Sequence, residues 1–483
     1  MKNNNTKSTY VSPLAKRYSS KEMSYLFSEE KKIKTWRLLW ISLAKAEKKL
    51  GLNISKEQID DLIKYKNDIN FNKANEYEKE LRHDVFAHIK TYGDIAKKAK
   101  GIIHLGATSC YVGDNTDIII QKEALLLLKS KLLLLIQILS KFCDKYKSTP
   151  TLSFTHFQPA QPTTIGKRAS LWLYDLYIDF NDLCLLEENI KFLGCRGTTG
   201  TESSFLELFN GSNKKCIELN ELIKKDFNFK EIHPISAQTY TRKMDYKIMA
   251  LLSSIAQSSH KFSNDLRLLQ HLKEIEEPFN KLQVGSSAMP YKRNPMRCER
   301  IASLSNFVMS NINNALYTAS SQWFERTLDD SANRRLSISE SFLATDGIIN
   351  LYINILDGLV VNKKMINKHI NEELPFLITE NIMMNEVTKY HKDRQKIHEV
   401  IRKLSIEAGE HIKKEGKENN LIELLIKSKD LHINEDDIKK IMNPNLYIGR
   451  SKEQVEDFLN NYIKPLLKKY SKEKYKNKII IEV

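Results

Sequence analysis

The sequence predicts an all-α protein built as an elongated bundle of long helices, with a smaller helical domain at each end. Only 16 glycines and 11 prolines occur among the 483 residues, and these two residue types interrupt helices most strongly. Apolar residues recur at helical spacing over long stretches, the longest being residues 115–146. Hydrophobic residues make up 41% of the chain, enough for a large buried core.

Each helix is expected where an apolar stripe is bounded by turn-forming residues. In chain order the expected helices cover residues 28–50, 56–66, 76–100, 115–146, 165–192, 241–274, 296–320 and 331–360. Loops rich in glycine or proline are expected at 101–113, 149–164 and 278–295. The C-terminal region predicts shorter, more charged helices, with breaks at Pro375, Gly409 and Pro444.

These elements divide into three predicted domains. The N-terminal helical domain with active-site segments covers 1–111, the central long-helix bundle and oligomer core covers 112–361, and the C-terminal helical domain covers 362–483. The leucine-rich run 125–135 is apolar on nearly every side, so its helix must be buried on more than one face. Helices of other subunits would supply that cover. The alternative is the central helix of a monomeric bundle.

The net charge and the cysteine content limit the classes of function that the protein can have. The net charge is +16, but basic residues are spread along the chain without an arginine-rich block, which favours a solvated surface over a nucleic-acid partner. The six cysteines form no CxxC pair, so no zinc ribbon is indicated. The N-terminus lacks a signal peptide, and Lys129 and Lys131 interrupt the apolar run 124–136. We therefore expect a soluble cytoplasmic protein with neither nucleic-acid nor membrane partners.

The most unusual segment is residues 285–300, GSSAMPYKRNPMRCER. Gly285 and the two serines after it indicate a flexible turn suited to a mobile lid. Lys292 and Asn294 place a cation and an amide near a helix N-terminus, where an anion is favoured. An ordinary surface loop would explain the glycine, serines and prolines, but not the lysine, asparagine, glutamate and arginines packed with them.

This segment resembles the SSxMPxKxNP signature of the fumarase/aspartase superfamily, in the form of its adenylosuccinate lyase branch. Further segments resemble that branch in the same order: HLGATSC at 104–110, THFQPAQPTT at 155–164, LDDSANRR at 328–335 and RQKIH at 394–398. The resemblance implies a fumarase/aspartase-like fold and a homotetramer in which three subunits meet at each active site. It implies cleavage of a C–N bond that releases fumarate from adenylosuccinate or SAICAR, with no redox cofactor and no catalytic metal.

The residue chemistry suits this reaction. A proton leaves the carbon beside a carboxylate, and Lys292 and Asn294 can stabilise the resulting aci-carboxylate dianion. His156 can protonate the leaving nitrogen near neutral pH. The family assigns the base to a serine of the SS pair, which carries over to Ser286, with Ser287 beside it. A serine acts as a base only where its alkoxide is stabilised locally.

Binding residues also follow from the resemblance, because the substrates carry a phosphate and a succinyl dicarboxylate. The predicted substrate-binding residues are Arg17, Tyr18, Arg82, His83, Asp84, Thr108, Ser109, Gln238, Ser287, Arg300, Arg326, Ser331 and Arg335. Ser331 and Arg335 are four residues apart, which places them on one face of a helix. With Arg326 they predict a phosphate clamp.

Some residues have a structural alternative. His83 is equally consistent with a hydrogen-bonded structural histidine on a helix. Glu299, in the catalytic set, is either a first-turn acid favoured by the helix dipole or a partner that orients Lys292 or a histidine. Arg334, next to Arg335, is expected to be a surface ion-pair residue.

Three other functions compete. A sister enzyme such as argininosuccinate lyase or fumarase acts on a substrate without phosphate, so the predicted clamp disfavours it. A nucleic-acid-binding helical protein is suggested only by the net charge. A catalytically inactive relative, like the lens crystallin of this superfamily, is disfavoured because His156, Ser286, Lys292 and Asn294 are all present.

Overall fold

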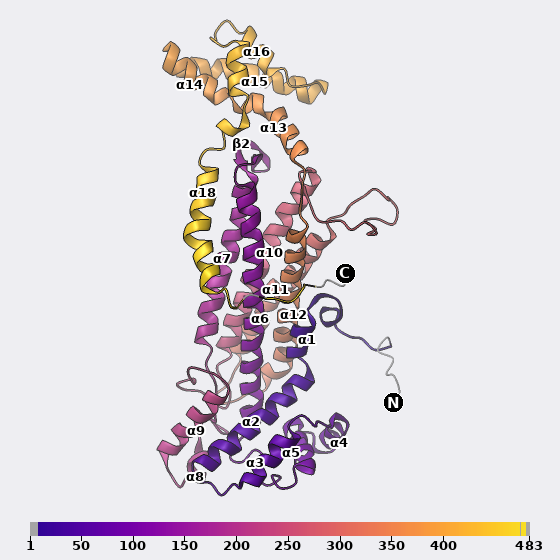
Figure 1. Ribbon diagram of the computed structural model, residues 1–483, viewed down its shortest axis with the longest axis vertical. Coiled ribbons are helices and arrows are strands. Elements are labelled where there is room, and N and C mark those ends of the chain that lie inside the picture. The colour runs from indigo at the N-terminus through magenta and orange to yellow at the C-terminus, as the bar shows by residue number, and fades with distance from the viewer. Residues whose placement is uncertain (1–7, 474, 480–483) are drawn as a thin grey trace.

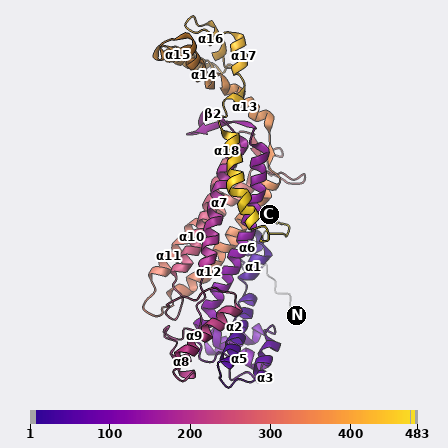
Figure 2. The same cartoon turned by 60° about the vertical axis from the view of Figure 1, so that its left-hand side comes forward.

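The structure is a computed structural model that describes residues 8–473 and 475–479. Its centre is an elongated bundle of long helices, with smaller helical groups at both ends (Figures 1 and 2). The bundle helices are α6 (Ser109–Tyr146), α7 (Ile165–Asn189), α10 (Lys243–His271), α11 (Met296–Ser320) and α12 (Asp329–Asp357). Strand pairing in the described residues consists of two small antiparallel pairs and one isolated parallel bridge between Phe192 and Ile232. The predicted all-α elongated bundle is therefore confirmed.

Helix α6 runs through the middle of the bundle. Its 38 residues give a length of about 57 Å at 1.5 Å per residue. Its leucine-rich stretch packs against helices of the same chain, and Leu128, Leu132 and Leu135 are fully buried. The inference that other subunits must cover this helix is wrong, because α7, α12 and α2 (Glu29–Lys49) already do so.

The N-terminal helices lie beside and below the bundle in Figure 1. They are η1 (Leu14–Tyr18), α1 (Lys21–Leu26), α2, α3 (Lys56–Tyr65), α4 (Phe71–Leu81) and α5 (Asp84–Ile95), joined at the lower end by α8 (Ser203–Leu208) and α9 (Asn213–Asp226). The single helix expected over 76–100 is divided, because Arg82 adopts a left-handed conformation (φ 54°) that ends α4. His83 then caps α5, with Nδ1 accepting a hydrogen bond from the Phe86 N–H at 3.1 Å.

The loop expected over 149–164 is instead a β-hairpin of β1 (Pro150–Thr155) and β2 (Gln158–Thr164). Its turn consists of His156 and Phe157, which have φ values of 53° and 58°. Two consecutive left-handed residues make the tight turn that matches the twist of paired strands. The prolines mislead a sequence-based prediction here, because a two-stranded hairpin consists entirely of edge strands, where proline is tolerated.

The C-terminal helices form two groups. One group has a hydrophobic core of its own at the upper end and contains α13 (Lys363–Leu377), α14 (Thr379–Tyr390), α15 (Arg394–Glu415), α16 (Leu421–Lys427) and α17 (Glu435–Ile441). After η2 (Pro444–Leu446), the second group of α18 (Ser451–Phe458), η3 (Leu459–Ile463) and α19 (Lys464–Lys469) returns along the bundle.

The break expected at Pro444 occurs, and the one expected at Pro375 falls two residues later, where α13 ends at Leu377. The break expected at Gly409 does not occur. Pro375 lies in the last turn of α13, near the helix end, and α15 continues through Gly409 at the modest cost of a helical glycine. Among the described residues, none of the helices is both long and apolar enough to cross a membrane.

Candidate active site

A cavity of about 310 Å³ lies between the N-terminal turns of α2, α5, α6 and α12. Its lining includes Asp84, Ser109, Arg326, Ser331 and Arg335. These five residues come from three separate segments of the sequence, and all belong to the predicted substrate-binding set. The cavity therefore brings together five of the thirteen predicted substrate-binding residues.

Ser331 and Arg335 share one face of α12, as their spacing predicts. The guanidinium of Arg335 lies 3.6 Å from the Asp84 carboxylate, and 67% of the Arg335 side chain remains exposed. Such an exposed ion pair holds its partners weakly. Arg335 is therefore free to turn toward an anion in the cavity.

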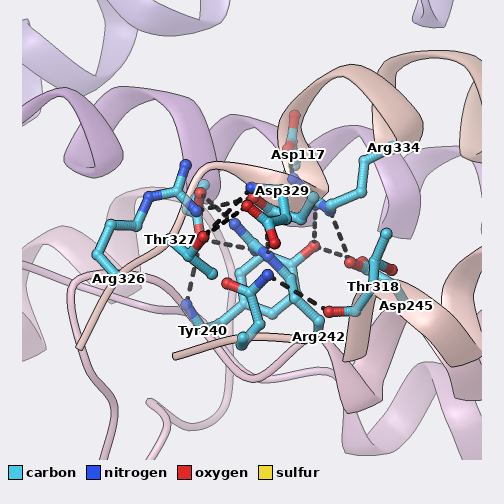
Figure 3. Close-up of polar contacts among 12 residues, drawn as sticks. Asp117, Tyr240, Arg242, Asp245, Thr318, Arg326, Thr327, Asp329 and Arg334 are labelled. Carbon is cyan, nitrogen blue, oxygen red and sulfur yellow. Dashed lines mark hydrogen bonds and ion pairs between the residues drawn. The ribbon is translucent and has the colours of Figure 1, made fainter. Parts of the chain in front are cut away.

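A buried ion network forms part of the cavity wall, which includes Asp114, Arg242 and Asp330. Figure 3 shows the polar contacts of this network. Arg242 binds Asp114 through two N–H groups, at 2.9 and 3.2 Å, and donates from Nε to Asp330 at 2.5 Å. Arg326 donates to the other oxygen of Asp330 at 2.9 Å. Burial opposes ionisation of Asp330, but the Arg242 and Arg326 guanidinium groups outweigh it and lower the Asp330 pKa. The Arg326 side chain is thereby oriented at the cavity wall.

Arg334 belongs to the same buried network, so its prediction as a surface residue is wrong. It donates to Asp245 at 2.7 Å and to the Tyr240 hydroxyl at 2.6 Å, and it pairs with Asp117 at 3.0 Å. Adjacent positions on a helix point about 100° apart. The two side chains consequently have different partners: Arg335 pairs with Asp84, whereas Arg334 anchors α12 to α6 and α10, and both border the cavity.

The turn before α6 carries further predicted residues. His83 Nε2 lies 3.4 Å from the Ser109 hydroxyl, so His83 both caps α5 and borders the cavity. Thr108 is the residue before α6. Gln238 donates to the Thr198 carbonyl at 2.9 Å and accepts from Cys110 at 3.3 Å, which places it beside this turn. Arg82 is exposed at the end of α4.

His104 supports this turn, although its motif suggested no role for it. The Trp40 indole N–H donates to Nδ1 of His104 at 2.9 Å. Burial is the main reason that the His104 pKa is lowered to about 4. The ring is therefore neutral at pH 7 and accepts this hydrogen bond.

The segment with the SS signature forms an exposed loop between β3 (Ile275–Glu276), which pairs with β4 (Val360–Val361), and α11. In Figure 1 this loop projects from the side of the bundle. The Ser286 hydroxyl oxygen accepts hydrogen bonds from the backbone N–H groups of Ala288 and Met289, at 3.3 and 3.1 Å. Asn294 donates to the Gly285 carbonyl at 2.7 Å, and Lys292 is exposed.

Gly285 is required where the loop closes on itself. A Cβ at this position would lie 2.0 Å from the Lys292 carbonyl oxygen, which no side chain permits. Ser287 is exposed on the same loop. Glu299 is also exposed and lies in the first turn of α11, while Arg300 follows it half-buried.

The base of this loop is held by Glu277, which the motifs do not indicate. Its carboxylate accepts from the backbone N–H groups of Arg297 and Cys298, at 3.2 and 2.7 Å. It therefore caps α11 from a distant part of the chain. Because the capping residue lies about twenty positions before the helix, no local capping signature reveals it.

His156 and the N-terminal segment lie apart from the cavity. His156 is exposed at the hairpin turn, at the upper end of the bundle in Figure 1, whereas Ser109 begins α6 at the lower end. The full length of α6 separates them. Arg17 and Tyr18 lie on η1, and Tyr18 packs against Gly347 of α12.

Comparison with known proteins indicates the family of the chain. The family model described as Lyase matches residues 9–310, and the one described as Adenylosuccinate lyase C-terminus matches residues 375–458. Adenylosuccinate lyase of Schizosaccharomyces pombe is 48% identical, over 95% of this chain and 96% of its own length. The Saccharomyces cerevisiae enzyme of the same name is 46% identical, over 97% of this chain and 98% of its own.

Solved structures show the same fold. The 3-carboxy-cis,cis-muconate lactonizing enzyme from Pseudomonas putida superposes with a TM-score of 0.81 at 18% identity, covering 93% of this chain and 99% of its own. At that identity the likeness concerns the fold alone. The fold, the clustered motif residues and the near-full-length sequence similarity together lead to one conclusion: the chain belongs to the adenylosuccinate lyase family.

Proposed function

We propose that this chain catalyses the β-elimination of fumarate from adenylosuccinate, giving AMP, and from SAICAR, giving AICAR. The similarity to adenylosuccinate lyases over nearly the whole chain supports the reaction class. The observation that carries the substrate choice is the cavity lined by Arg326, Ser331 and Arg335. Two guanidinium groups and a hydroxyl suit a phosphate, which the substrates of argininosuccinate lyase and fumarase lack.

In this proposal Ser286, as its alkoxide, removes a proton from the succinyl carbon beside a carboxylate. The two backbone N–H groups already bonded to its oxygen supply the local stabilisation that an alkoxide needs. Lys292 and Asn294 stabilise the aci-carboxylate dianion. His156 donates a proton to the leaving nitrogen as the C–N bond breaks, the bonding pair goes to that nitrogen, and fumarate forms.

We also propose a homotetramer in which three subunits contribute to each site. The hairpin with His156 and the cavity are separated by α6, about 57 Å long for its 38 residues. The loop with Ser286 and the loop with Arg326 lie at opposite ends of α11, about 37 Å long for its 25 residues. A single chain of this elongated shape cannot bring His156, Ser286 and the cavity together. Copies of the chain related by symmetry must therefore supply them to one site.

The same proposal places the protein in the cytoplasm with small-molecule substrates as its ligands and without nucleic-acid or membrane partners. All six cysteines are unpaired thiols, which suits a reducing compartment.

The decisive experiment mixes the purified protein with adenylosuccinate and follows the ultraviolet absorbance change together with fumarate release. We expect turnover of adenylosuccinate and SAICAR, and none of argininosuccinate. Absence of turnover on both purine substrates by a protein of tetrameric mass would overturn the proposal. Salt-sensitive nucleic-acid binding in its place would favour the competing class.

A further inference from the structure

The N-terminal segment with Arg17 and Tyr18 packs against residues of the bundle helices. None of these contact residues belongs to the sequence motifs described above. On α12, the Asp346 carboxylate accepts a hydrogen bond from the Ser20 backbone N–H at 2.6 Å. The next residue, Gly347, faces Tyr18 so closely that a Cβ there would lie 3.1 Å from the Tyr18 Cβ and carbonyl oxygen. Two adjacent positions of α12 thus contact residues 18 and 20 directly.

Asp346 is held by a second buried charge. Lys131 of α6 donates to the free oxygen of Asp346 at 2.5 Å and to the Ser20 hydroxyl at 3.1 Å. Both charged side chains have no exposed surface. A buried ion pair adds little to stability compared with an apolar pair, but it defines one geometry strictly, because a misplaced partner would leave a buried charge alone. The pair therefore defines where Ser20 lies.

The C-terminal segment packs against Lys131 and α1 from the outer side of the bundle. The Tyr475 backbone N–H donates to the Ser130 carbonyl at 3.2 Å, and its ring lies 5.2 Å from the Lys131 ammonium. The Tyr475 hydroxyl donates to Glu22 of α1 at 2.9 Å, and Asn477 donates to the same carboxylate oxygen at 3.2 Å. In Figures 1 and 2 the described end of the chain lies beside α1.

We infer that Asp346, Gly347, Lys131 and Tyr475 are positioning residues for substrate binding, because they determine where η1 presents Arg17 and Tyr18. This inference rests on the proposed function, which makes η1 a binding segment. Residues 14–18 form a single helical turn, closed by the Ser19 N–H, which donates to the Leu14 carbonyl at 2.9 Å. A displacement of Tyr18 is therefore transmitted to Arg17. Contacts that act on binding rather than on chemistry change KM and leave kcat unaltered.

The test variant is Gly347→Ala. Its methyl group would push Tyr18 outward by a few tenths of an ångström, while alanine favours the helix over glycine. The matched control is Gly409→Ala on α15, where a Cβ meets nothing within 4 Å. We expect the KM for adenylosuccinate to rise at least about threefold in Gly347→Ala, with kcat within about twofold of the parent, and no change in the control.

A second variant does not disturb the bundle. Tyr475→Phe keeps the ring over Lys131 and removes the hydrogen bond to Glu22. We expect the same rise in KM, of smaller size, with an unchanged melting temperature. If Gly347→Ala fails to fold, Tyr475→Phe decides the question. An unchanged KM in every variant that folds would overturn the positioning role, whereas a parent protein without turnover would overturn the proposed function.

Discussion

Buried charge is the clearest feature of this protein at the scale of single residues. Arg242, Arg334 and Lys131 are all buried, and each has a carboxylate partner within 3.0 Å. Glu47 of α2 is different, because it is fully buried and neither of its carboxylate oxygens has a hydrogen-bond partner. Burial raises the Glu47 pKa to about 8. Glu47 is therefore protonated at neutral pH.

The buried Glu47 predicts a dependence of stability on pH. Its folded-state pKa exceeds the unfolded value of 4.5, so the folded protein binds more protons between pH 4.5 and about 8. The free energy of unfolding should consequently fall as the pH rises through this window, by up to about 1.4 kcal/mol per unit from this group. Glu47→Gln should flatten that dependence in denaturation curves measured at pH 5.5 and 8. An unchanged slope in the variant would contradict the assignment.

Substitutions of the two serines in the loop should have different effects on catalysis. Ser286 has two backbone N–H donors on its oxygen, whereas Ser287 is exposed. Ser286→Ala should lower kcat by at least about 100-fold, since it removes the group that takes the proton. Ser287→Ala, as the matched control, should mainly raise KM. Near-normal elimination by Ser286→Ala in a stopped-flow assay would exclude it as the base.

At the scale of elements, the features that present the candidate residues are turns and helix ends. His156 lies in a two-residue hairpin turn, Ser109 begins α6, and Ser331 and Arg335 lie in the first two turns of α12. Helix starts offer unpaired N–H groups and a favourable dipole for anions. The elements therefore contribute orientation and electrostatics together.

Two substitutions at the hairpin turn distinguish the effect of His156 on the fold from its effect on catalysis. His156→Asn should keep the hairpin, because asparagine tolerates the left-handed conformation that φ 53° requires. It should lower kcat by about 100-fold or more, since an amide cannot protonate the leaving nitrogen. His156→Val should also disturb the turn, because β-branched residues avoid positive φ. Circular dichroism and kcat for both variants test this, and an active His156→Asn would contradict the acid role.

At the scale of the whole molecule, the separation of the three groups is the decisive feature. The hairpin and the loop with the SS signature lie at different places along an elongated bundle (Figure 1). The cavity lies at the first turn of α6, at the opposite end of that helix from the hairpin. This separation predicts complementation between inactive variants. Mixing His156→Asn and Ser286→Ala after reversible dissociation should restore roughly a quarter of the parent activity, because random assembly leaves some sites with both native groups. No recovery in a reassembled mixture of tetrameric mass would argue against shared sites.

Part of this protein could be predicted from its sequence alone. Helical periodicity predicts the long helices, because the core face of a helix repeats every 3.6 residues. The ordered motifs indicate the family and the candidate residues, including the shared helix face of Ser331 and Arg335. These features are local, so neighbouring residues suffice to define them.

Only the tertiary structure decided the rest. Arg334 is buried because Asp117 and Asp245 reach it from α6 and α10, and Gly347 contacts Tyr18 across more than 300 positions of the chain. The cover of α6 by its own chain and the cap of α11 by Glu277 are decided in the same way. Each depends on which distant groups packing brings together, and a pairing of that kind leaves no periodicity or spacing in the sequence of either partner.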